Sequence, residues 1–359
     1  MYMKKYLLSI FSLCFAAIAI AQETEKASPW SCNGVVGLNA SATGLVNWAA
    51  GGNNNVNGVA FGKVRLLYNE NNISWETNLD LEYGLSYIDQ EFDAFQKSSD
   101  KINFTTKLGW QFHKAWFLTA SADFKSQFAP GRKYGVSDAY DPIVSKFLAP
   151  AYTDIAVGID WKPNDIFSVY ISPIAGRLTS VYVSDKLEDK YATDQPGLAQ
   201  SLKESYAVWK YETKENGEVI KNYDCNLRGK LGLSIKGAIN YTYKDLKIIT
   251  SVGLYTPYAW DKTKIYENAE GKLYADLSEE GVDFSEMTFK GYRDNNQRFG
   301  NFDVDWDTAI SYQFLKCLNV TLSTSLKYYN GVKIANAEGI AAERVQFKGT
   351  LGLGVGYSF

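Results

Sequence analysis

Hydrophobic and polar residues alternate strictly along the last sixteen residues of the chain. One parity carries Val345, Phe347, Leu351, Leu353, Val355, Tyr357 and Phe359, and the other carries Arg344 followed by polar residues and glycines. Because a β-strand sends successive side chains to opposite faces, this segment predicts a strand with one apolar and one polar face. Such strands are typical of outer-membrane barrels, where apolar side chains face lipid and polar ones face the lumen.

Similar alternation recurs along the chain and predicts twelve strands. They are expected near residues 33–47, 56–68, 75–87, 102–112, 116–127, 152–161, 167–174, 227–243, 248–254, 302–314, 318–328 and 344–359. The first two are weakly patterned, and without them ten strands remain. An even number of strands with alternating short and long connections predicts an all-β fold, a transmembrane antiparallel up-and-down β-barrel.

The lengths of the connections predict which way the barrel points. Short turns are expected at residues 69–72, 113–115, 162–165, 244–246 and 315–317, and long charged loops at 176–222 and 259–300. In outer-membrane barrels the short turns are periplasmic and the long loops extracellular. An aromatic girdle is expected near the short turns, formed by Trp75, Trp110, Trp116 and Trp161. An exported soluble β-protein is the alternative, but a β-sandwich has no reason to sort its loops in this way.

The N-terminus has the pattern of an export signal. Lys4 and Lys5 precede an apolar stretch at residues 7–18, and Ala19-Ile20-Ala21 forms a small-residue cleavage site. We therefore expect a signal peptide at 1–21, a short periplasmic segment at 22–32 and the barrel at 33–359. Beyond residue 22 no unbroken apolar run is long enough for a spanning helix, so insertion requires a closed barrel.

Composition changes this picture little. The chain has 25 Tyr, 19 Phe and 9 Trp, and its formal net charge of −3 gives no case for nucleic-acid binding. The mean hydropathy of −0.24 is uninformative, since half of each barrel strand is polar. Three cysteines remain after cleavage, Cys32, Cys225 and Cys317, so a full disulfide framework is excluded. We expect free thiols, with pairing of Cys32 and Cys317 at the periplasmic rim as the alternative.

Charged residues on the polar parity are expected to line the lumen. These are Glu76, Asp80, Glu82, Lys107, Asp123, Arg228, Lys230, Lys236, Asp303, Asp305, Asp307, Lys327 and Arg344. Strand counting places Asp305 opposite Lys327, Asp80 or Glu82 near Lys107, and Lys107 near Asp123, within one register step. If these charges pair they fill the lumen, and if Arg228 and Lys230 stay apart from the three aspartates they form a charged constriction. Twelve strands lie between filled and open barrels, so strand number leaves both outcomes open.

Neither a catalytic nor a metal site is predicted. His113, the single histidine, falls in a short turn, far from where an outer-membrane Ser-His site would need it. The spacing Asp303-x-Asp305-x-Asp307 resembles the start of a calcium loop but lacks the central glycine and closing glutamate. We expect no enzyme activity and no cofactor.

Four short stretches resemble a family of Gram-negative outer-membrane barrels known only as a domain of unknown function. They are Asn47-Trp48-Ala49-Ala50-Gly51-Gly52-Asn53, Ser126-Gln127-Phe128-Ala129-Pro130-Gly131, Ser145-Lys146-Phe147-Leu148-Ala149-Pro150-Ala151-Tyr152 and Ser172-Pro173-Ile174-Ala175-Gly176. The resemblance implies an outer-membrane location and carries over no catalytic residue. The terminal Phe359 is similar to the signal by which the barrel-assembly machinery recognises its substrates, so this machinery and outer-membrane lipid are the expected partners.

Two functions follow as hypotheses. The first is a narrow channel for passive passage of small polar solutes. The second is a closed barrel whose extracellular loops have a structural role or bind a ligand or partner. Aromatic side chains on such loops can bind a partner, or they can pack over the barrel mouth as a lid. The loops carry these aromatic residues among many charged ones: Tyr182, Tyr191, Tyr206, Trp209, Tyr211, Trp260, Tyr266 and Tyr274.

Overall fold

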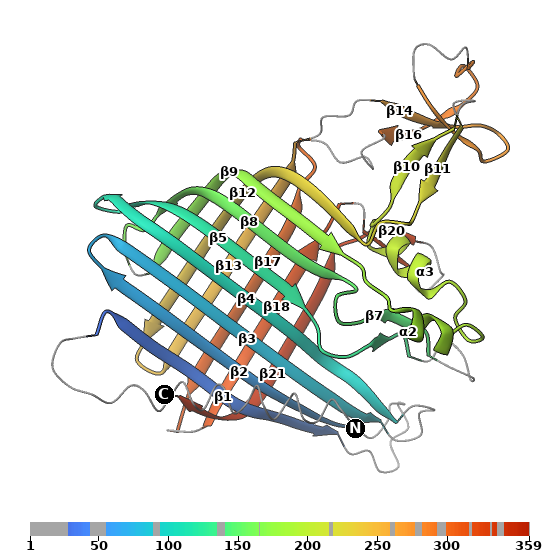
Figure 1. The fold of residues 1–359 in the computed structure, drawn as a ribbon. Coiled ribbons are helices and arrows are strands. Elements are labelled where there is room, and N and C mark those ends of the chain that lie inside the picture. Colours follow the sequence, from blue (N-terminus) through green and yellow to red (C-terminus); the bar gives the residue numbers. More distant parts are fainter. Residues whose placement is uncertain are drawn as a thin grey trace.

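A closed antiparallel sheet forms the body of the molecule in the computed structural model (Figure 1). The structure describes residues 28–43, 55–88, 94–134, 141–164, 166–214, 218–258, 263–276, 282–292, 299–315, 318–330, 332–335 and 341–358. The ring runs in the order β1 (Trp30–Thr43), β2 (Asn55–Glu70), β3 (Ile73–Ile88), β4 (Phe95–His113), β5 (Trp116–Ser126), β8 (Ala151–Trp161), β9 (Phe167–Ser180), β12 (Leu227–Tyr243), β13 (Leu246–Pro257), β17 (Asp303–Gln313), β18 (Leu318–Tyr328) and β21 (Gln346–Ser358). Because β21 pairs with β1, the predicted twelve-stranded barrel is confirmed and includes the two weakly patterned strands.

Several strand ends differ from those expected. β1 begins at Trp30, β4 at Phe95 and β21 at Gln346, and β9 continues to Ser180 instead of ending near Ile174. The β9 difference has a clear cause: its pairing with both neighbours is irregular around residues 172–175. Ile171 and Ile174 both point outward, being 47 % and 61 % exposed. The irregularity therefore shifts the alternation by one residue, which makes a regular pattern appear to stop there.

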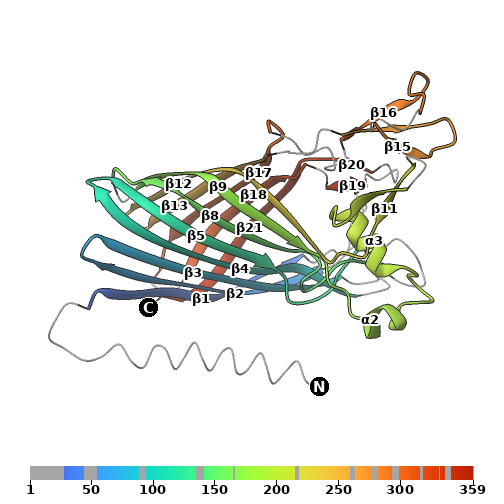
Figure 2. The ribbon, with the colours of Figure 1, turned by 45° about the horizontal axis from the view of Figure 1, so that its top comes forward.

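The two ends of the barrel differ as the loop lengths predicted. Turns of a few residues join β2 to β3, β4 to β5, β8 to β9, β12 to β13 and β17 to β18, all at one end, where β1 starts and β21 finishes (Figure 2). We call this the short-turn end and the opposite one the long-loop end. The four tryptophans expected in a girdle lie near the short-turn end, and Trp116 contacts Trp161 with ring centroids 6.0 Å apart.

The outer surface of the ring is apolar, and its polar atoms bond to one another. Aliphatic side chains such as Leu108, Ile155 and Leu118 are about half exposed to the surroundings. On the same face, the Trp75 indole donates to the Thr106 hydroxyl at 2.8 Å. β13 and β17 carry a matching group. The Trp306 indole donates to the Thr250 hydroxyl at 3.1 Å, and the Thr250 and Thr308 hydroxyls are 2.8 Å apart. Such pairing is needed on a lipid-facing surface, where no water satisfies polar groups.

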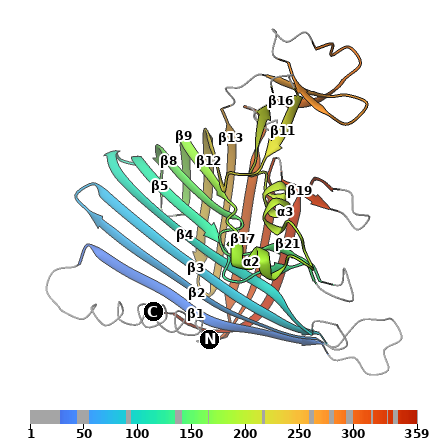
Figure 3. The same ribbon diagram turned by 45° about the vertical axis from the view of Figure 1, so that its right-hand side comes forward.

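The connections at the long-loop end are folded, which the pattern of the sequence did not predict. β7 (Ile143–Ser145), α2 (Asp185–Lys190) and α3 (Leu198–Ser205), together with their connecting residues, form a unit that we call the cap (Figure 3). Ile143, Ala149, Val181, Leu198, Leu202 and Val208 form its buried core. Beyond the cap, a five-stranded sheet projects from the barrel, made of β10 (Lys210–Thr213), β11 (Glu218–Asn222), β15 (Leu273–Ala275), β14 (Lys264–Glu267) and β16 (Thr288–Tyr292).

Two small pairs complete this end of the molecule. β6 (Gly131–Arg132) pairs with β7, and β19 (Lys333–Ala335) pairs with β20 (Ala341–Glu343). Among the described residues, no helix combines the length and the apolar character that crossing a bilayer requires.

Candidate functional site: charge pairs across the lumen

Arg177 joins two carboxylates that come from different sides of the barrel. Its guanidinium donates through Nε and Nη2 to the two carboxylate oxygens of Asp154 on the neighbouring β8, at 2.8 and 2.9 Å. Its Nη1 donates to Asp303 Oδ2 at 2.8 Å, although β12 and β13 lie between β9 and β17 in the ring. The three side chains are only 11 %, 15 % and 7 % exposed. Since forked charge-assisted bonds are strong and directional, this triad fixes two parts of the wall to each other.

A second link crosses the lumen almost along a diameter. Lys125 on β5 lies 3.8 Å from Asp305 on β17, and these two strands occupy opposite sides of the ring. Asp305 also accepts a hydrogen bond from the Tyr329 hydroxyl. The Tyr329 ring packs against Tyr152 of β8, with ring centroids 5.6 Å apart. The end of β18 therefore folds inward and reaches the far wall.

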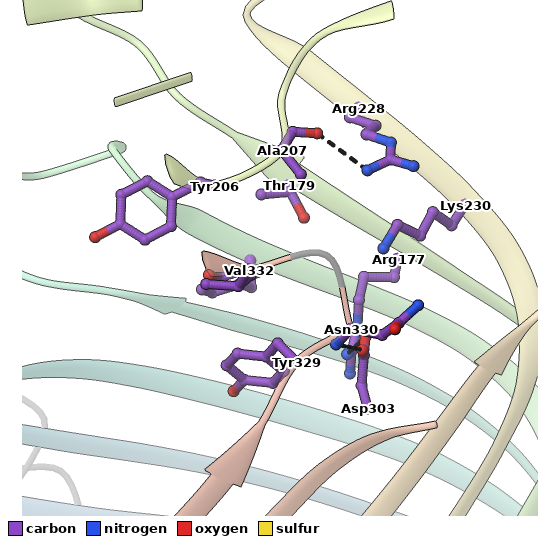
Figure 4. A pocket seen from close by; sticks show the side chains of 11 residues that line it. Arg177, Thr179, Tyr206, Ala207, Arg228, Lys230, Asp303, Tyr329, Asn330 and Val332 are labelled. Carbon is purple, nitrogen blue, oxygen red and sulfur yellow. Dashed lines mark hydrogen bonds and ion pairs between the residues drawn. The ribbon is translucent and has the colours of Figure 1, made fainter. Parts of the chain in front are cut away.

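The cap closes onto this cluster from the outside. Arg228 of β12 donates to the Ala207 carbonyl at 3.0 Å, and the backbone N–H of Asn330 donates to Asp303 at 2.8 Å (Figure 4). A small cavity of about 20 Å³ remains between Arg177, Arg228, Lys230, Asp303, Tyr206 and Tyr329, together with Tyr152, Thr179, Ala207, Asn330 and Val332. That volume suits about one water molecule.

Two further charge pairs lie deeper in the lumen. Lys236 of β12 contacts Asp123 of β5, with β8 and β9 between them in the ring. Nearer the short-turn end, Asp160 is fully buried and lies 3.1 Å from Lys107 and 3.4 Å from Lys162. The buried Tyr170 fills the space beside Lys107, and its hydroxyl donates to the Thr119 carbonyl at 3.2 Å. Arg177 and Lys125 thus bridge the lumen toward the long-loop end and Lys236 bridges it deeper, whereas Lys107 and Asp160 reach only across β5.

The predicted lumen residues divide into several groups. Asp123, Lys236, Asp303 and Asp305 take part in the pairs that cross the lumen, and Arg228 and Lys230 line the small cavity. Glu76 pairs with Arg65 at 2.9 Å, Asp80 pairs with Lys101, and Glu82 lies 3.7 Å from Lys348. Asp307 lies on β17 opposite Ser325, and it is exposed.

The expected neighbours were partly right. Asp305 lies opposite Lys327, as strand counting predicted. Lys107 lies opposite Ser121, one step along the same face from Asp123, as expected. It does not lie near Asp80 or Glu82: the register places it opposite Glu76, and its ion pair is with Asp160 two strands away. β4 begins at Phe95 instead of near Ile102, so its connection to β3 is shorter than expected and the register between the two strands shifts. Arg344 lies between β20 and β21, where its Nε donates to the Ile334 carbonyl at 3.3 Å, so it precedes the barrel strand on which it was expected.

Arg177, Asp154 and Lys125 form the centre of the network, and none of them was singled out from the sequence. Arg177 follows the irregularity in β9 and was therefore assigned to a loop. Asp154 and Lys125 share the polar parity of their strands, which was a usable signal. Strand patterns cannot show which lumen residues meet across the ring, however, because that depends on the curvature of the closed sheet.

The remaining chemical candidates carry little further weight. His113 is exposed at the β4–β5 turn, as expected. Cys32 and Cys225 are free, whereas Cys317 lies outside the described residues, so the alternative pairing is untested. No group of metal-ligating side chains is present in the part of the chain that the structure describes. The absence of enzyme activity stays a prediction.

Comparisons with known proteins find a family model and several solved structures. Residues 40–131 match a family model described as "Protein of unknown function (DUF3078)", which confirms the expected resemblance over this part and includes two of the four quoted stretches. No curated protein matches. Solved structures that align include an outer membrane channel from Pseudomonas putida F1 (12 % identity, 94 % of this chain and 99 % of that chain, TM-score 0.35) and the NanC porin (7 % identity, 90 % and 97 %, TM-score 0.32).

Proposed function

We propose that this protein is an outer-membrane β-barrel whose lumen is closed at rest, and that it acts through its folded extracellular side. One observation carries the proposal: ion pairs cross the lumen at two depths, and the widest of them, Lys125 with Asp305, joins opposite walls. In each pair at least one side chain has low solvent exposure, so separating the pair would leave a buried charge without its partner. The cap seals the same end with a hydrophobic core of its own.

The location follows from the surface of the ring. A closed barrel with an apolar exterior is suited to lipid, and the tryptophans near the short-turn end have the position of an interfacial girdle. On this basis the short-turn end is periplasmic and the cap extracellular. We further propose export through residues 1–21 and assembly through recognition of the terminal Phe359, both of which lie outside the described residues.

A narrow channel for small polar solutes is the second candidate function. It is favoured by the mixed charges on the inner wall, which would attract and guide ions once the pairs had separated. Conduction would then require displacement of the cap and of the segment that carries Tyr329. The two candidates therefore differ in whether the unperturbed barrel conducts.

Single-channel recording in planar lipid bilayers separates these functions. We expect the intact protein to be silent, and the triple variant Lys125→Ala, Arg177→Ala and Lys236→Ala, which removes the cation of each pair that crosses the lumen, to give conductance steps. Arg65→Ala is the matched control, because the ion pair of Arg65 among the described residues is with Glu76 on the adjacent strand and does not bridge the lumen. Regular conductance steps from the intact protein would favour the channel over the closed barrel. A silent triple variant that is shown to be folded by its gel mobility would mean that the cap or other groups close the lumen.

A further inference from the structure

The ring is weakly closed between its first and last strands. β1 pairs with β2 over fourteen residue pairs and β21 pairs with β18 over ten, whereas β1 and β21 share only five. These five run from Val35 with Ser358 to Asn39 with Gly354, in the middle of β1 and at the short-turn end of β21. Residues 40–43 and 346–353 continue as strands toward the long-loop end. Among the described residues, however, these two segments do not pair with each other. In Figure 3, β1 and β21 accordingly diverge toward that end.

Apolar side chains on both sides of the opening are exposed. Leu351 is 71 % exposed and Leu353 63 %, and Leu38, at a paired position beside the opening, is 66 % exposed; on strands paired on both sides, Leu118 is 47 % and Ile174 61 % exposed. Along residues 40–43 and 346–353, the edge N–H and C=O groups that point across the seam have no paired strand there. Lipid tails offer them no hydrogen-bond partner, so lumen water or the polar head of a ligand must supply one.

The inner wall behind the opening is thin and polar. A Cβ on Gly354 would lie 2.0 Å from Asn39 Oδ1, and one on Gly352 would lie 3.4 Å from Asn39 Cγ, so the Asn39 carboxamide covers two positions without side chains. Lys348 of β21 places a cation on the inner wall, in the part of β21 that has no pairing with β1. Its Nζ lies 2.9 Å from Ser99 Oγ on β4 and 3.7 Å from Glu82 on β3. Because β1 and β2 lie between β21 and β3 in the ring, this ammonium passes behind the open seam.

We propose that the outer half of the β1–β21 seam is a lateral binding port for a single-chain amphiphile with a carboxylate head group. The alkyl chain would lie between the lips formed by Leu38, Leu351 and Leu353, and the head would reach Lys348 inside. An alkyl chain is about as wide as the spacing of paired strands, about 4.8 Å, so an opened seam suits one chain better than a two-chain phospholipid. The Lys348 ammonium has three N–H donors; it bonds the Ser99 hydroxyl at 2.9 Å, while Glu82 lies at 3.7 Å, beyond hydrogen-bond distance, so a ligand carboxylate can accept a further bond. The port rests on the proposed membrane location and not on the closed lumen, so a conducting barrel would leave it intact.

Disulfide cross-linking tests the opening itself, in protein whose native cysteines are replaced by serine. Leu38→Cys with Val355→Cys joins two residues that the structure pairs. Ala40→Cys with Leu353→Cys joins the next position on the same face if the pairing continued. In lipid vesicles, we expect the disulfide of the Leu38→Cys and Val355→Cys pair to form at least tenfold faster than that of the Ala40→Cys and Leu353→Cys pair. Equal rates would show a closed seam and would overturn the port.

Fluorescence quenching tests the ligand, with 16-doxyl-stearic acid as the probe. A bimane label at Ser41→Cys, on the inner parity beside the opening, should be quenched saturably, whereas one at Ser323→Cys in the middle of β18 should not. The methyl ester of the probe and Lys348→Gln should each weaken binding at least tenfold, and Lys348→Arg should retain it. Stronger quenching by a doxyl-labelled phosphatidic acid would reassign the port to phospholipid. Equal quenching at both labels, or binding that ignores Lys348→Gln, would overturn the proposal.

Discussion

Replacing Arg177 with alanine is expected to destabilise the barrel strongly. The guanidinium is shared by Asp154 on β8 and Asp303 on β17, through three bonds of 2.8 to 2.9 Å. Its plane also lies against the Tyr255 ring, with the guanidinium carbon 4.5 Å from the ring centroid. The variant would leave two carboxylates facing each other without the cation that they share.

The size of the loss follows from the burial of the triad. Removing one partner of a buried ion pair costs about 3–5 kcal/mol, because the remaining charge is left uncompensated. Since the three side chains retain 7 % to 15 % exposure, some solvent screening remains and we expect the lower end, about 3 kcal/mol. Arg177→Lys keeps the charge but cannot form the planar fork, so it should lose about 1–2 kcal/mol.

Urea unfolding of the barrel in lipid vesicles, followed by tryptophan fluorescence, measures these losses. Arg65→Ala is the matched control, because the Arg65–Glu76 pair joins adjacent strands with side chains 44 % and 22 % exposed. Such a pair should contribute less than about 1 kcal/mol. If Arg177→Ala lost no more than Arg65→Ala, the cross-lumen triad would not hold the wall together and the reasoning would be refuted.

Three further predictions concern the wall and the cap. Gly158→Ala should destabilise the barrel by about 2–3 kcal/mol through overpacking, since the new Cβ would lie 2.2 Å from the Ile171 carbonyl oxygen; Gly58→Ala, with nothing within 4 Å, should change the same unfolding curve by less than about 0.5 kcal/mol. Asp100→Asn should make the loop after β5 sensitive to limited proteolysis, because the carboxylate is 2 % exposed and accepts two backbone N–H groups of that loop at 2.8 and 2.9 Å; unchanged cleavage would show that the loop is held elsewhere. Burial raises the pKa of Tyr206 to about 12, against about 10 in the unfolded chain. The contribution of this shift to cap stability is therefore complete below about pH 10 and is lost as the pH rises to about 12, so proteolysis of the cap should increase over this range. Tyr206→Phe should remove this part of the increase.

The alternation of apolar and polar residues was enough to predict the barrel. A period of two needs no knowledge of distant contacts, so the strands, their inner and outer faces and the short turns were all readable from local pattern. The same locality explains what was missed. The irregularity in β9 changed the phase of the alternation and hid Arg177, and the long connections showed no period although they fold into the cap.

Which charges meet, and where the ring is weakly closed, depends on contacts between distant parts of the chain and could not be predicted from the alternation. Lys125 and Asp305 are far apart in sequence and lie on opposite walls, so their contact depends on the curvature and stagger of the closed sheet. The pairing of β1 with β21 likewise joins the two ends of the chain, and its length is set by how the whole ring closes. Alternation assigns each side chain to a face, but the partner across the lumen and the extent of the seam are properties of the closed barrel, to which all twelve strands contribute.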